Sequence, residues 1–204
     1  MKKITFTLIL ALALVAGYRL MFPAAHIRNL PPSGETIICF GDSLTSGYGA
    51  SEGMDYPARL SRMLGRPVIN AGVAGDTTGS ALERVQSDVL SHSPRIVLIT
   101  LGGNDLKNRV PRAEAFENLK QIVEVIQDRG ALVIIGGIDL PLFGRGYGRA
   151  YQTLAEETGA ILIPDILGGI FGKRELMSDP IHPNDAGYER MARHFLEAIP
   201  PQAL

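Results

Sequence analysis

Cysteine and histidine are scarce in this 204-residue sequence. Cys39 is the only cysteine, which excludes an intramolecular disulfide and any metal site built from several cysteines. Cys39 lies within an apolar run, just before Phe40, so we expect its thiol to be buried in the core. The four histidines are scattered along the chain, which argues against a histidine-rich metal cage.

An excess of charge of one sign is missing as well. Twenty Lys and Arg residues against 21 Asp and Glu residues give a net charge of −1, which excludes nucleic-acid binding through a broadly basic surface. The sequence has no internal repeat and no low-complexity tract, and this excludes repeat arrays and fibrous folds. With 46% apolar and 20% charged residues, the chain can bury the core of one ordinary domain.

Several short motifs with well-defined chemistry are absent. There is no G-x-x-x-x-G-K-[ST] and no G-x-G-x-x-G after a strand, which argues against a phosphate-binding loop and a dinucleotide-binding fold. There is no H-E-x-x-H zinc motif, and Asp179 with His182 alone would make too small a metal site. G-x-S-x-G is also missing, so a catalytic serine would not lie on an α/β-hydrolase elbow.

A long hydrophobic run is found at the N-terminus. Lys2 and Lys3 precede an apolar stretch at residues 4–17, an order that is typical of a secretory signal. Residues 4–22 also have nearly the ~20 residues that span a bilayer, and Arg19 can snorkel to the interface. Both interpretations predict export, to the periplasm or outside the cell, and the second adds a membrane anchor.

The sequence divides into three parts. We assign residues 1–23 to the signal peptide or anchor and residues 24–34 to a linker, because Pro31 and Pro32 interrupt regular structure there. Residues 35–204 form the predicted folded domain. Contact with a membrane is expected only through the N-terminal segment, if it is not cleaved.

Short apolar runs alternate with amphipathic segments in this domain. Strands are predicted at residues 35–40, 67–71, 96–101, 131–136 and 161–163. Helices are predicted at residues 55–64, 78–91, 112–129, 149–158 and 184–199. Because each strand is apolar throughout and is followed by a helix, we predict a single-domain α/β fold, a three-layer α/β/α sandwich with a five-stranded parallel sheet.

Glycine and small polar residues follow the first three predicted strands, at residues 41–44, 71–76 and 102–105. Ligands of open α/β sheets bind beyond the carboxyl ends of the strands, and glycine lets the backbone approach them closely. The alternative is that the glycines only turn the chain and that Asp42, Asp76 and Asn104 only cap helices. Three such loops at one edge of the sheet favour a functional site.

A serine hydroxyl becomes a good nucleophile when a neighbouring base, usually a histidine, takes its proton. His26 lies in the leader or linker, His92 ends a predicted helix, and His194 lies within the last helix. These positions leave His182 as the candidate base.

Prolines stiffen the segment around His182. Pro180 and Pro183 favour extended conformations for the residues that precede them. Asp179 is then in reach of one imidazole nitrogen while the other nitrogen faces outward. The alternative is a rigid turn in which Asn184 caps the last helix and His182 is solvated.

Four short blocks occur in order along the chain: GDSL at residues 41–44, NAG at 70–72, GND at 103–105, and Asp179-x-x-His182. These blocks resemble those of the SGNH, or GDSL, hydrolases, and the resemblance covers about residues 35–199. The surrounding segments are similar to the bacterial branch of exported acyl thioesterases, lysophospholipases and arylesterases. The resemblance implies a flavodoxin-like SGNH hydrolase fold.

The resemblance also implies a role for each block. Ser43 matches the nucleophile, His182 the general base, and Asp179 the group that orients the base. The oxyanion-hole donors match the backbone N–H groups of Ser43 and Gly72 and the side-chain amide of Asn104. Donors held around a developing oxyanion lower the barrier, and losing one typically costs about 2.7–4 kcal/mol.

The function implied is that of a serine esterase, which hydrolyses carboxylic esters or thioesters through an acyl-enzyme intermediate and needs no metal or organic cofactor. The expected partner is a small-molecule ester or a lipid-like acyl substrate. A carbohydrate O-acetyl esterase is the alternative within the same chemistry. A non-catalytic α/β binding module is the alternative from another class.

A Gly- and Pro-containing loop, residues 138–147, follows the fourth predicted strand. Loops on a rigid scaffold commonly shape substrate sites. We therefore hypothesise that Leu140, Leu142 and Phe143 contact the acyl chain. The alternative is that these side chains only cover the edge of the sheet.

Overall fold

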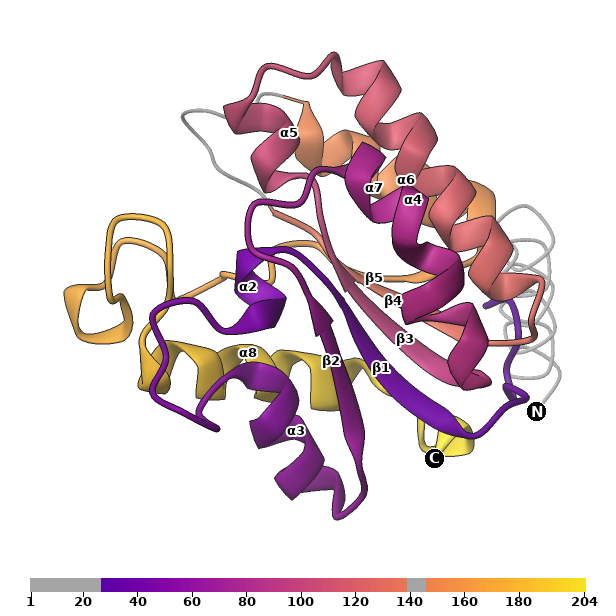
Figure 1. Cartoon of the computed structure of the whole chain (residues 1–204), viewed down its shortest axis with the longest axis horizontal. Helices are drawn as coiled ribbons and strands as arrows, with labels where there is room; N and C mark the ends of the chain where they lie inside the picture. The colour runs from indigo at the N-terminus through magenta and orange to yellow at the C-terminus, as the bar shows by residue number, and fades with distance from the viewer. Residues whose placement is uncertain (1–26, 139–145) are drawn as a thin grey trace, which may run out of the picture.

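The computed structural model describes residues 27–138 and 146–204, and a five-stranded sheet lies at its centre (Figure 1). The strands are β1 (Thr36–Gly41), β2 (Val68–Gly72), β3 (Pro94–Thr100), β4 (Leu132–Gly136) and β5 (Ile161–Ile163). They pair in the order β2-β1-β3-β4-β5, and every pair is parallel. The predicted α/β sandwich with a five-stranded parallel sheet is confirmed.

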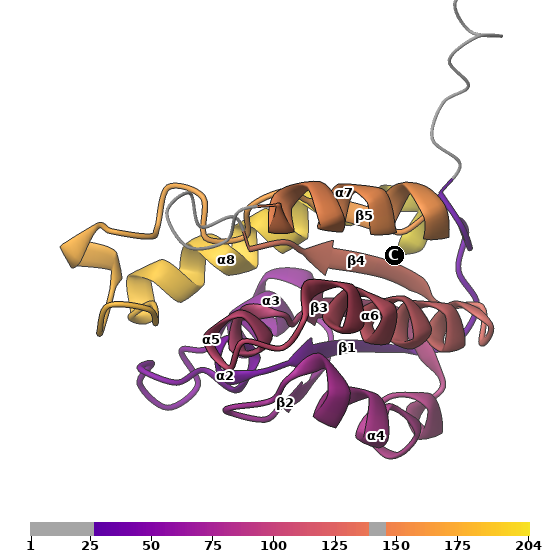
Figure 2. The same cartoon turned by 90° about the horizontal axis from the view of Figure 1, so that it is seen from above.

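Helices cover both faces of this sheet. The longer helices are α3 (Tyr56–Leu64), α4 (Thr78–Asp88), α6 (Arg112–Gln127), α7 (Tyr147–Thr158) and α8 (Asp185–Ala198). Helices α3 and α8 pack together on one face of the sheet. Helices α4, α6 and α7 lie side by side on the other face, which is nearest the viewer in Figure 2. The short α2 (Ser43–Ser46) and α5 (Gly103–Lys107) follow β1 and β3 directly, and 3-10 turns occur at Leu90–His92, Arg174–Leu176 and Pro201–Ala203.

The central strands carry the core. Almost all residues of β1, β3 and β4 are buried, whereas the edge strands β2 and β5 are half-exposed. Tyr56 and Phe195 stack between α3 and α8, with ring centroids 5.1 Å apart. Cys39 is fully buried in β1, as expected, and burial raises the pKa of its thiol.

Polar side chains set where the helices begin. Asp55 caps α3 by accepting the Ala58 N–H at 2.9 Å. The hydroxyl of Thr77 caps α4 in a reciprocal pair with Ser80. Asn184 caps α8, as the alternative interpretation of the loop around His182 expected. Such caps satisfy backbone donors that have no partner within the helix.

The described chain starts at the amino end of the sheet, away from α2 and α5 (Figure 2). Residues 27–34, expected to be part of a linker, are hydrogen-bonded to the domain: the Arg28 N–H donates to Gly159 O, and the Asn29 amide donates to Gln127 O and Ala131 O. The proposed signal or anchor at residues 1–23 lies outside the described residues. Within residues 27–138 and 146–204, none of the helices is both long and apolar enough to cross a membrane.

Candidate active site

Ser43 is the first residue of α2, at the carboxyl end of β1. Asp42 caps this helix, because its Oδ1 accepts the Leu44 N–H at 3.0 Å. The Ser43 N–H, in the first turn, has no acceptor within the helix. A Cβ on Gly41 would collide with the backbone and side chain of Thr100, so only glycine lets β1 turn into α2 here.

The loop between β5 and α8 brings His182 to Ser43, 139 positions away in the sequence. Nε2 of His182 lies 3.0 Å from Oγ of Ser43. Nδ1 of the same ring lies 2.7 Å from Oδ2 of Asp179. The structure therefore joins the three predicted side chains in one hydrogen-bonded chain.

Asp179 also organises its own loop. Its Oδ1 accepts the backbone N–H groups of Ile181 and His182, each at 2.8 Å. Burial alone would raise the pKa of the Asp179 carboxyl, but these N–H groups and the His182 ring outweigh it and hold that pKa below its usual range. Asp179 is thus held as a carboxylate that faces the imidazole.

An aromatic ring covers His182. The ring of Tyr48 lies with its centroid 4.5 Å from that of His182, and the hydroxyl of Tyr188 donates to Tyr48 O at 2.8 Å. The side chain of His182 is 14% exposed, so the solvated turn of the alternative interpretation is wrong for this residue.

Asn104 lies within α5 and points its amide at the same edge of the sheet. Its Nδ2 donates to Asp76 O at 2.9 Å and approaches Oδ2 of Asp42 at 3.4 Å. Neither Asn104 nor Asp76 caps a helix: Gly102 precedes α5, and Thr77 caps α4. The capping interpretation therefore holds for Asp42 alone among the three polar loop residues.

Gly72 does not have the environment that its expected role requires. Its N–H donates to Oδ1 of Asn70 at 3.0 Å, and a Cβ on Gly72 would collide with the backbone of Ser46 in α2. This glycine allows close packing of β2 against α2, while its N–H is already engaged. Gly75 directly precedes Asp76, whose backbone carbonyl accepts the Asn104 amide. Gly75 is exposed, with φ +91° and open space at its Cβ position.

Three acidic side chains in the loops that form the site are buried, namely Asp42, Asp76 and Asp105. Asp105 accepts the N–H and the hydroxyl of Thr78, and Asp76 forms an ion pair with Arg84. Burial raises the pKa of Asp42 to about 7, and repulsion from Asp76 and Asp105 adds to the effect of burial.

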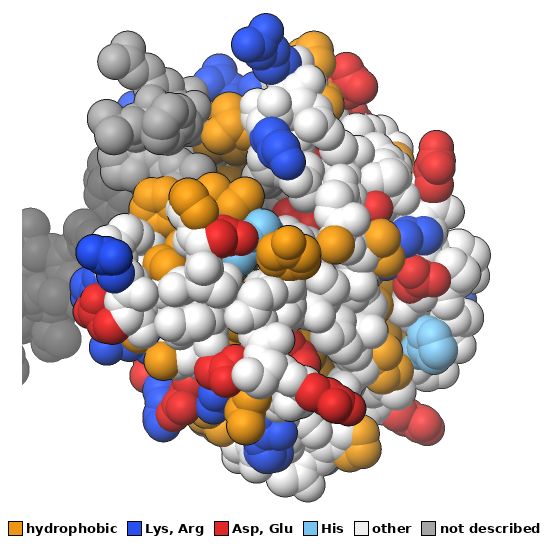
Figure 3. Space-filling view, turned by 60° about the vertical axis from the view of Figure 1, so that its left-hand side comes forward, with side chains coloured by type: hydrophobic (Ala, Val, Ile, Leu, Met, Phe, Trp, Pro, Cys, Tyr) orange, Lys and Arg blue, Asp and Glu red, His pale blue; other side chains and the backbone are white. Residues whose placement is uncertain are grey.

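A cavity of about 660 Å³ opens beside Ser43 and His182. Seven of its 13 lining residues are apolar: Leu44, Leu106, Ile138, Leu167, Phe171, Pro180 and Ile181. Figure 3 shows hydrophobic side chains gathered around a histidine on this face of the molecule. Leu140, Leu142 and Phe143, the hypothesised acyl contacts, lie outside the described residues.

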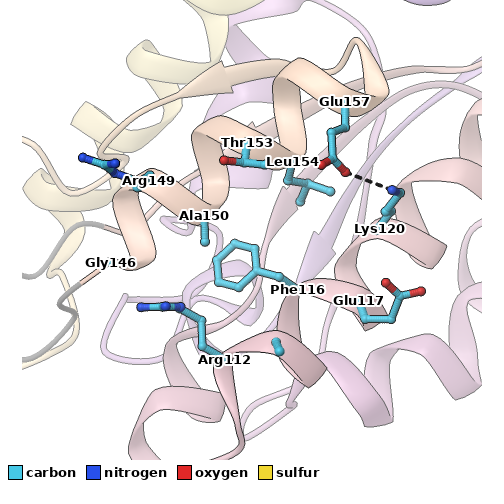
Figure 4. Close-up of a pocket in the computed structure, with 11 residues that line it drawn as sticks. Arg112, Phe116, Glu117, Lys120, Gly146, Arg149, Ala150, Thr153, Leu154 and Glu157 are labelled. Carbon is cyan, nitrogen blue, oxygen red and sulfur yellow. Dashed lines mark hydrogen bonds and ion pairs between the residues drawn. The ribbon is translucent and has the colours of Figure 1, made fainter.

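A second cavity, of about 510 Å³, lies between α6 and α7 (Figure 4). Charged side chains surround it: Arg112, Glu117 and Lys120 on α6, and Arg149 and Glu157 on α7, where Lys120 and Glu157 pair at 2.9 Å. It contains none of the predicted catalytic side chains. Among the described residues, no group of three or more His, Cys, Asp or Glu side chains could hold a metal ion.

A model of the GDSL-like lipase/acylhydrolase family matches residues 39–190. The chain belongs to this family. Over 160 residues it is 33% identical to thioesterase 1/protease 1/lysophospholipase L1 of Escherichia coli K12, covering 74% of this chain and 77% of the relative. It is 34% identical over 162 residues to an arylesterase of Vibrio mimicus, covering 74% of this chain and 81% of the relative.

A solved structure agrees with this membership. The crystal structure of TesA superposes with a TM-score of 0.78 at 28% identity, covering 82% of this chain and 99% of TesA. This GDSL hydrolase is therefore an enzyme that cleaves ester bonds, as the resemblance implied. The alternative of a non-catalytic binding module is not supported.

Proposed function

We propose that this GDSL hydrolase is a serine esterase for carboxylic esters or thioesters, and that Ser43, His182 and Asp179 carry its reaction. The observation that carries the proposal is the pair of contacts made by one imidazole. Its Nε2 lies 3.0 Å from the Ser43 hydroxyl oxygen, and its Nδ1 lies 2.7 Å from the Asp179 carboxylate. Both distances suit hydrogen bonds between a nucleophile, a base and the group that orients the base.

The reaction has two acyl-transfer steps. Oγ of Ser43 attacks the ester carbonyl carbon while Nε2 of His182 takes the hydroxyl proton. The tetrahedral intermediate expels the alcohol or thiol, which receives that proton from His182, and the acyl group stays on Ser43. Water then attacks the acyl-enzyme, gives one proton to His182, and the acid leaves as the proton returns to Ser43. These steps need no metal and no organic cofactor.

We assign the Ser43 N–H and the Asn104 amide as two of the donors that stabilise the oxyanion. The Ser43 N–H begins a helix and has no acceptor within it. The second N–H of Asn104 makes only the long, 3.4 Å approach to Asp42, so it can turn to a substrate oxygen. For the third donor we propose the N–H of Gly75 in place of Gly72, whose N–H is bonded to Asn70.

The cavity beside Ser43 supports an acyl substrate. Its largely apolar walls can bury hydrocarbon, which stabilises binding by about 0.8 kcal/mol per CH₂ group. The relatives are named as a thioesterase and lysophospholipase and as an arylesterase, which supports the same substrate class. Contact of Leu140, Leu142 and Phe143 with the acyl chain remains a hypothesis.

The decisive variant is Ser43→Ala, assayed with p-nitrophenyl acetate and with a fluorophosphonate probe. We expect a folded protein, no labelling by the probe, and a hydrolysis rate lower by at least about a thousandfold, because the nucleophile is gone. Ser61→Ala is the matched control, since Ser61 is a half-buried serine of α3 whose hydroxyl bonds Arg66 O and lies outside the cavity. Near-normal turnover by Ser43→Ala would contradict the proposal.

A substrate panel separates the possible esters. Wild-type enzyme is compared on acyl-CoA, lysophospholipid, aryl ester and acetylated xylan. We expect acyl-CoA, lysophospholipid or aryl ester to give the highest kcat/KM because the cavity is apolar. A clear preference for acetylated xylan would instead identify a carbohydrate O-acetyl esterase.

We also propose that the enzyme is exported through residues 1–23. The basic start followed by an apolar run supports this. The mass of the protein recovered from a periplasmic or membrane fraction distinguishes a cleaved signal from a retained anchor, and recovery from the cytoplasm alone would contradict export.

A further inference from the structure

Arg84 of α4 makes an unusual set of contacts just behind the site. Its side chain is only 16% exposed, and its guanidinium lies 4.4 Å from the centre of the Phe40 ring in β1. Nε bonds Oδ2 of Asp76 at 2.6 Å. Nη1 bonds Ala71 O at 3.0 Å, and Nη2 bonds Gly41 O at 2.9 Å.

The two backbone carbonyl groups that Arg84 bonds precede the proposed catalytic groups in the chain. Gly41 ends β1 and is followed by Asp42 and then by the nucleophile. Ala71 lies at the end of β2, before the loop that contains Asp76. One guanidinium thus joins the backbone on the nucleophile side to the backbone on the oxyanion side.

Asp76 links Arg84 to the Asn104 amide. The Asp76 carboxylate binds Arg84, and its Oδ1 accepts the Ser80 hydroxyl at 3.0 Å, so two contacts hold the side chain. The backbone carbonyl of the same residue accepts Nδ2 of Asn104 at 2.9 Å. Holding Asp76 therefore fixes one N–H of the amide and sets the direction of the other.

We propose that Arg84 is a positioning residue for the oxyanion side of the site, acting through Asp76 on the amide of Asn104. The inference rests on the proposed function of Asn104. Arg84 itself contacts neither the substrate nor the nucleophile. It orients the Asn104 amide, which donates to the substrate oxygen. The planar guanidinium suits this task, because its several N–H groups bond in fixed directions, which the ammonium of lysine cannot reproduce.

The size of the expected effect follows from the geometry. Removing an oxyanion donor outright lowers kcat by about 10²–10³-fold, and a misplacement of about 1 Å can cost about 10²-fold. Losing Arg84 leaves Asn104 in place but removes one of the two contacts that hold the Asp76 side chain. We therefore expect kcat to fall by roughly 10- to 100-fold in Arg84→Gln, with KM within about twofold, because the acyl cavity is untouched.

A double-mutant cycle with Asn104→Ala tests the inference. If Arg84 acts through Asn104, Arg84→Gln lowers kcat by less than about threefold once Asn104→Ala is present, because the two changes remove the same interaction. If Arg84 only joins β1 to β2, Arg84→Gln lowers kcat by the same factor in the wild-type protein and in Asn104→Ala. That equality would overturn the inference, as would an unchanged kcat in the single variant.

Two further variants complete the experiment. Asp76→Asn removes the charge that binds Arg84 with almost no change of shape, and it replaces Arg84→Gln in the cycle if that protein does not fold. Asp88→Asn is the matched control: it removes the 2.8 Å contact of Nη1 with Asp88, on the far side of the guanidinium from Asp76, and should leave kcat within about twofold. An Asn104→Ala variant with normal kcat would instead refute the proposed oxyanion role itself.

Discussion

Asp179→Asn tests the most specific consequence of the loop geometry. The two oxygens of the Asp179 carboxylate have different neighbours. Oδ1 accepts the N–H groups of Ile181 and His182, both at 2.8 Å, while Oδ2 lies 2.7 Å from Nδ1 of the imidazole. An asparagine there has only one oxygen, and the two N–H donors require it at the Oδ1 position.

The amide NH₂ group then faces Nδ1 of His182. Two donors cannot bond each other, so Nδ1 must give up its proton and the neutral ring must carry it on Nε2. An Nε2 that already holds a proton cannot accept the one from Ser43. We therefore expect Asp179→Asn to lower kcat by about 10⁴-fold, equivalent to about 5.5 kcal/mol in the barrier.

The assay is hydrolysis of p-nitrophenyl acetate, with thermal unfolding measured in parallel. The amide oxygen still accepts both N–H groups, so the loop and the unfolding temperature should remain close to wild type. Asp179→Ala should lose no more activity than the isosteric Asn variant. Asp185→Asn, at the start of α8, serves as a carboxylate control. If Asp179→Asn kept more than about a tenth of the wild-type kcat, the tautomer argument would be refuted.

Two further predictions concern stability and specificity. Because burial and neighbouring carboxylates raise the pKa of Asp42 from 3.8 to about 7, the folded protein binds this proton more tightly than the unfolded chain. The free energy of unfolding should therefore fall, by up to about 4 kcal/mol, as pH rises from about 4 to about 8. Urea unfolding at several pH values measures this slope, and Asp42→Asn should remove it. Equal slopes in the wild type and in Asp42→Asn would contradict the prediction. Phe171, which is 40% exposed, lines the cavity, so Phe171→Ala should lower kcat/KM for p-nitrophenyl octanoate about tenfold relative to acetate. Met54→Ala, an exposed apolar control outside the cavity, should leave that ratio unchanged.

The proposed catalytic side chains were the most predictable part of the site. Ser43 lies in the GDSL block, and the positions of the other three histidines left His182 as the candidate base. Pro180 and Pro183 indicated a stiff loop before Asn184. Helices α2 and α5 were not predicted, because four or five residues are too few to show an apolar period.

The proposal of Gly75 in place of Gly72 as an oxyanion donor depends on the strand register. Both glycines follow the same apolar run, but Gly72 is paired with Gly41 inside the sheet, and its N–H bonds Asn70. A sequence does not state where a strand stops pairing, so it does not state which N–H remains available. Ile138 lies in the loop that was predicted to shape the substrate site, although it was not singled out there. Leu167 and Phe171 were missed because they lie in the long segment between β5 and α8, whose sequence shows no apolar period.

The sequence by itself determined the kind of fold and the kind of chemistry. Apolar strands separated by amphipathic helices must pair in parallel with both faces covered, and a serine that follows the first strand must lie at the carboxyl edge of the sheet. Tertiary structure alone decided the distances at which side chains meet there. The 3.0 Å contact of His182 with Ser43, the cavity wall and the contacts of Arg84 all join residues from separate elements. Such distances depend on how helices and strands pack in three dimensions, and local sequence patterns do not record them.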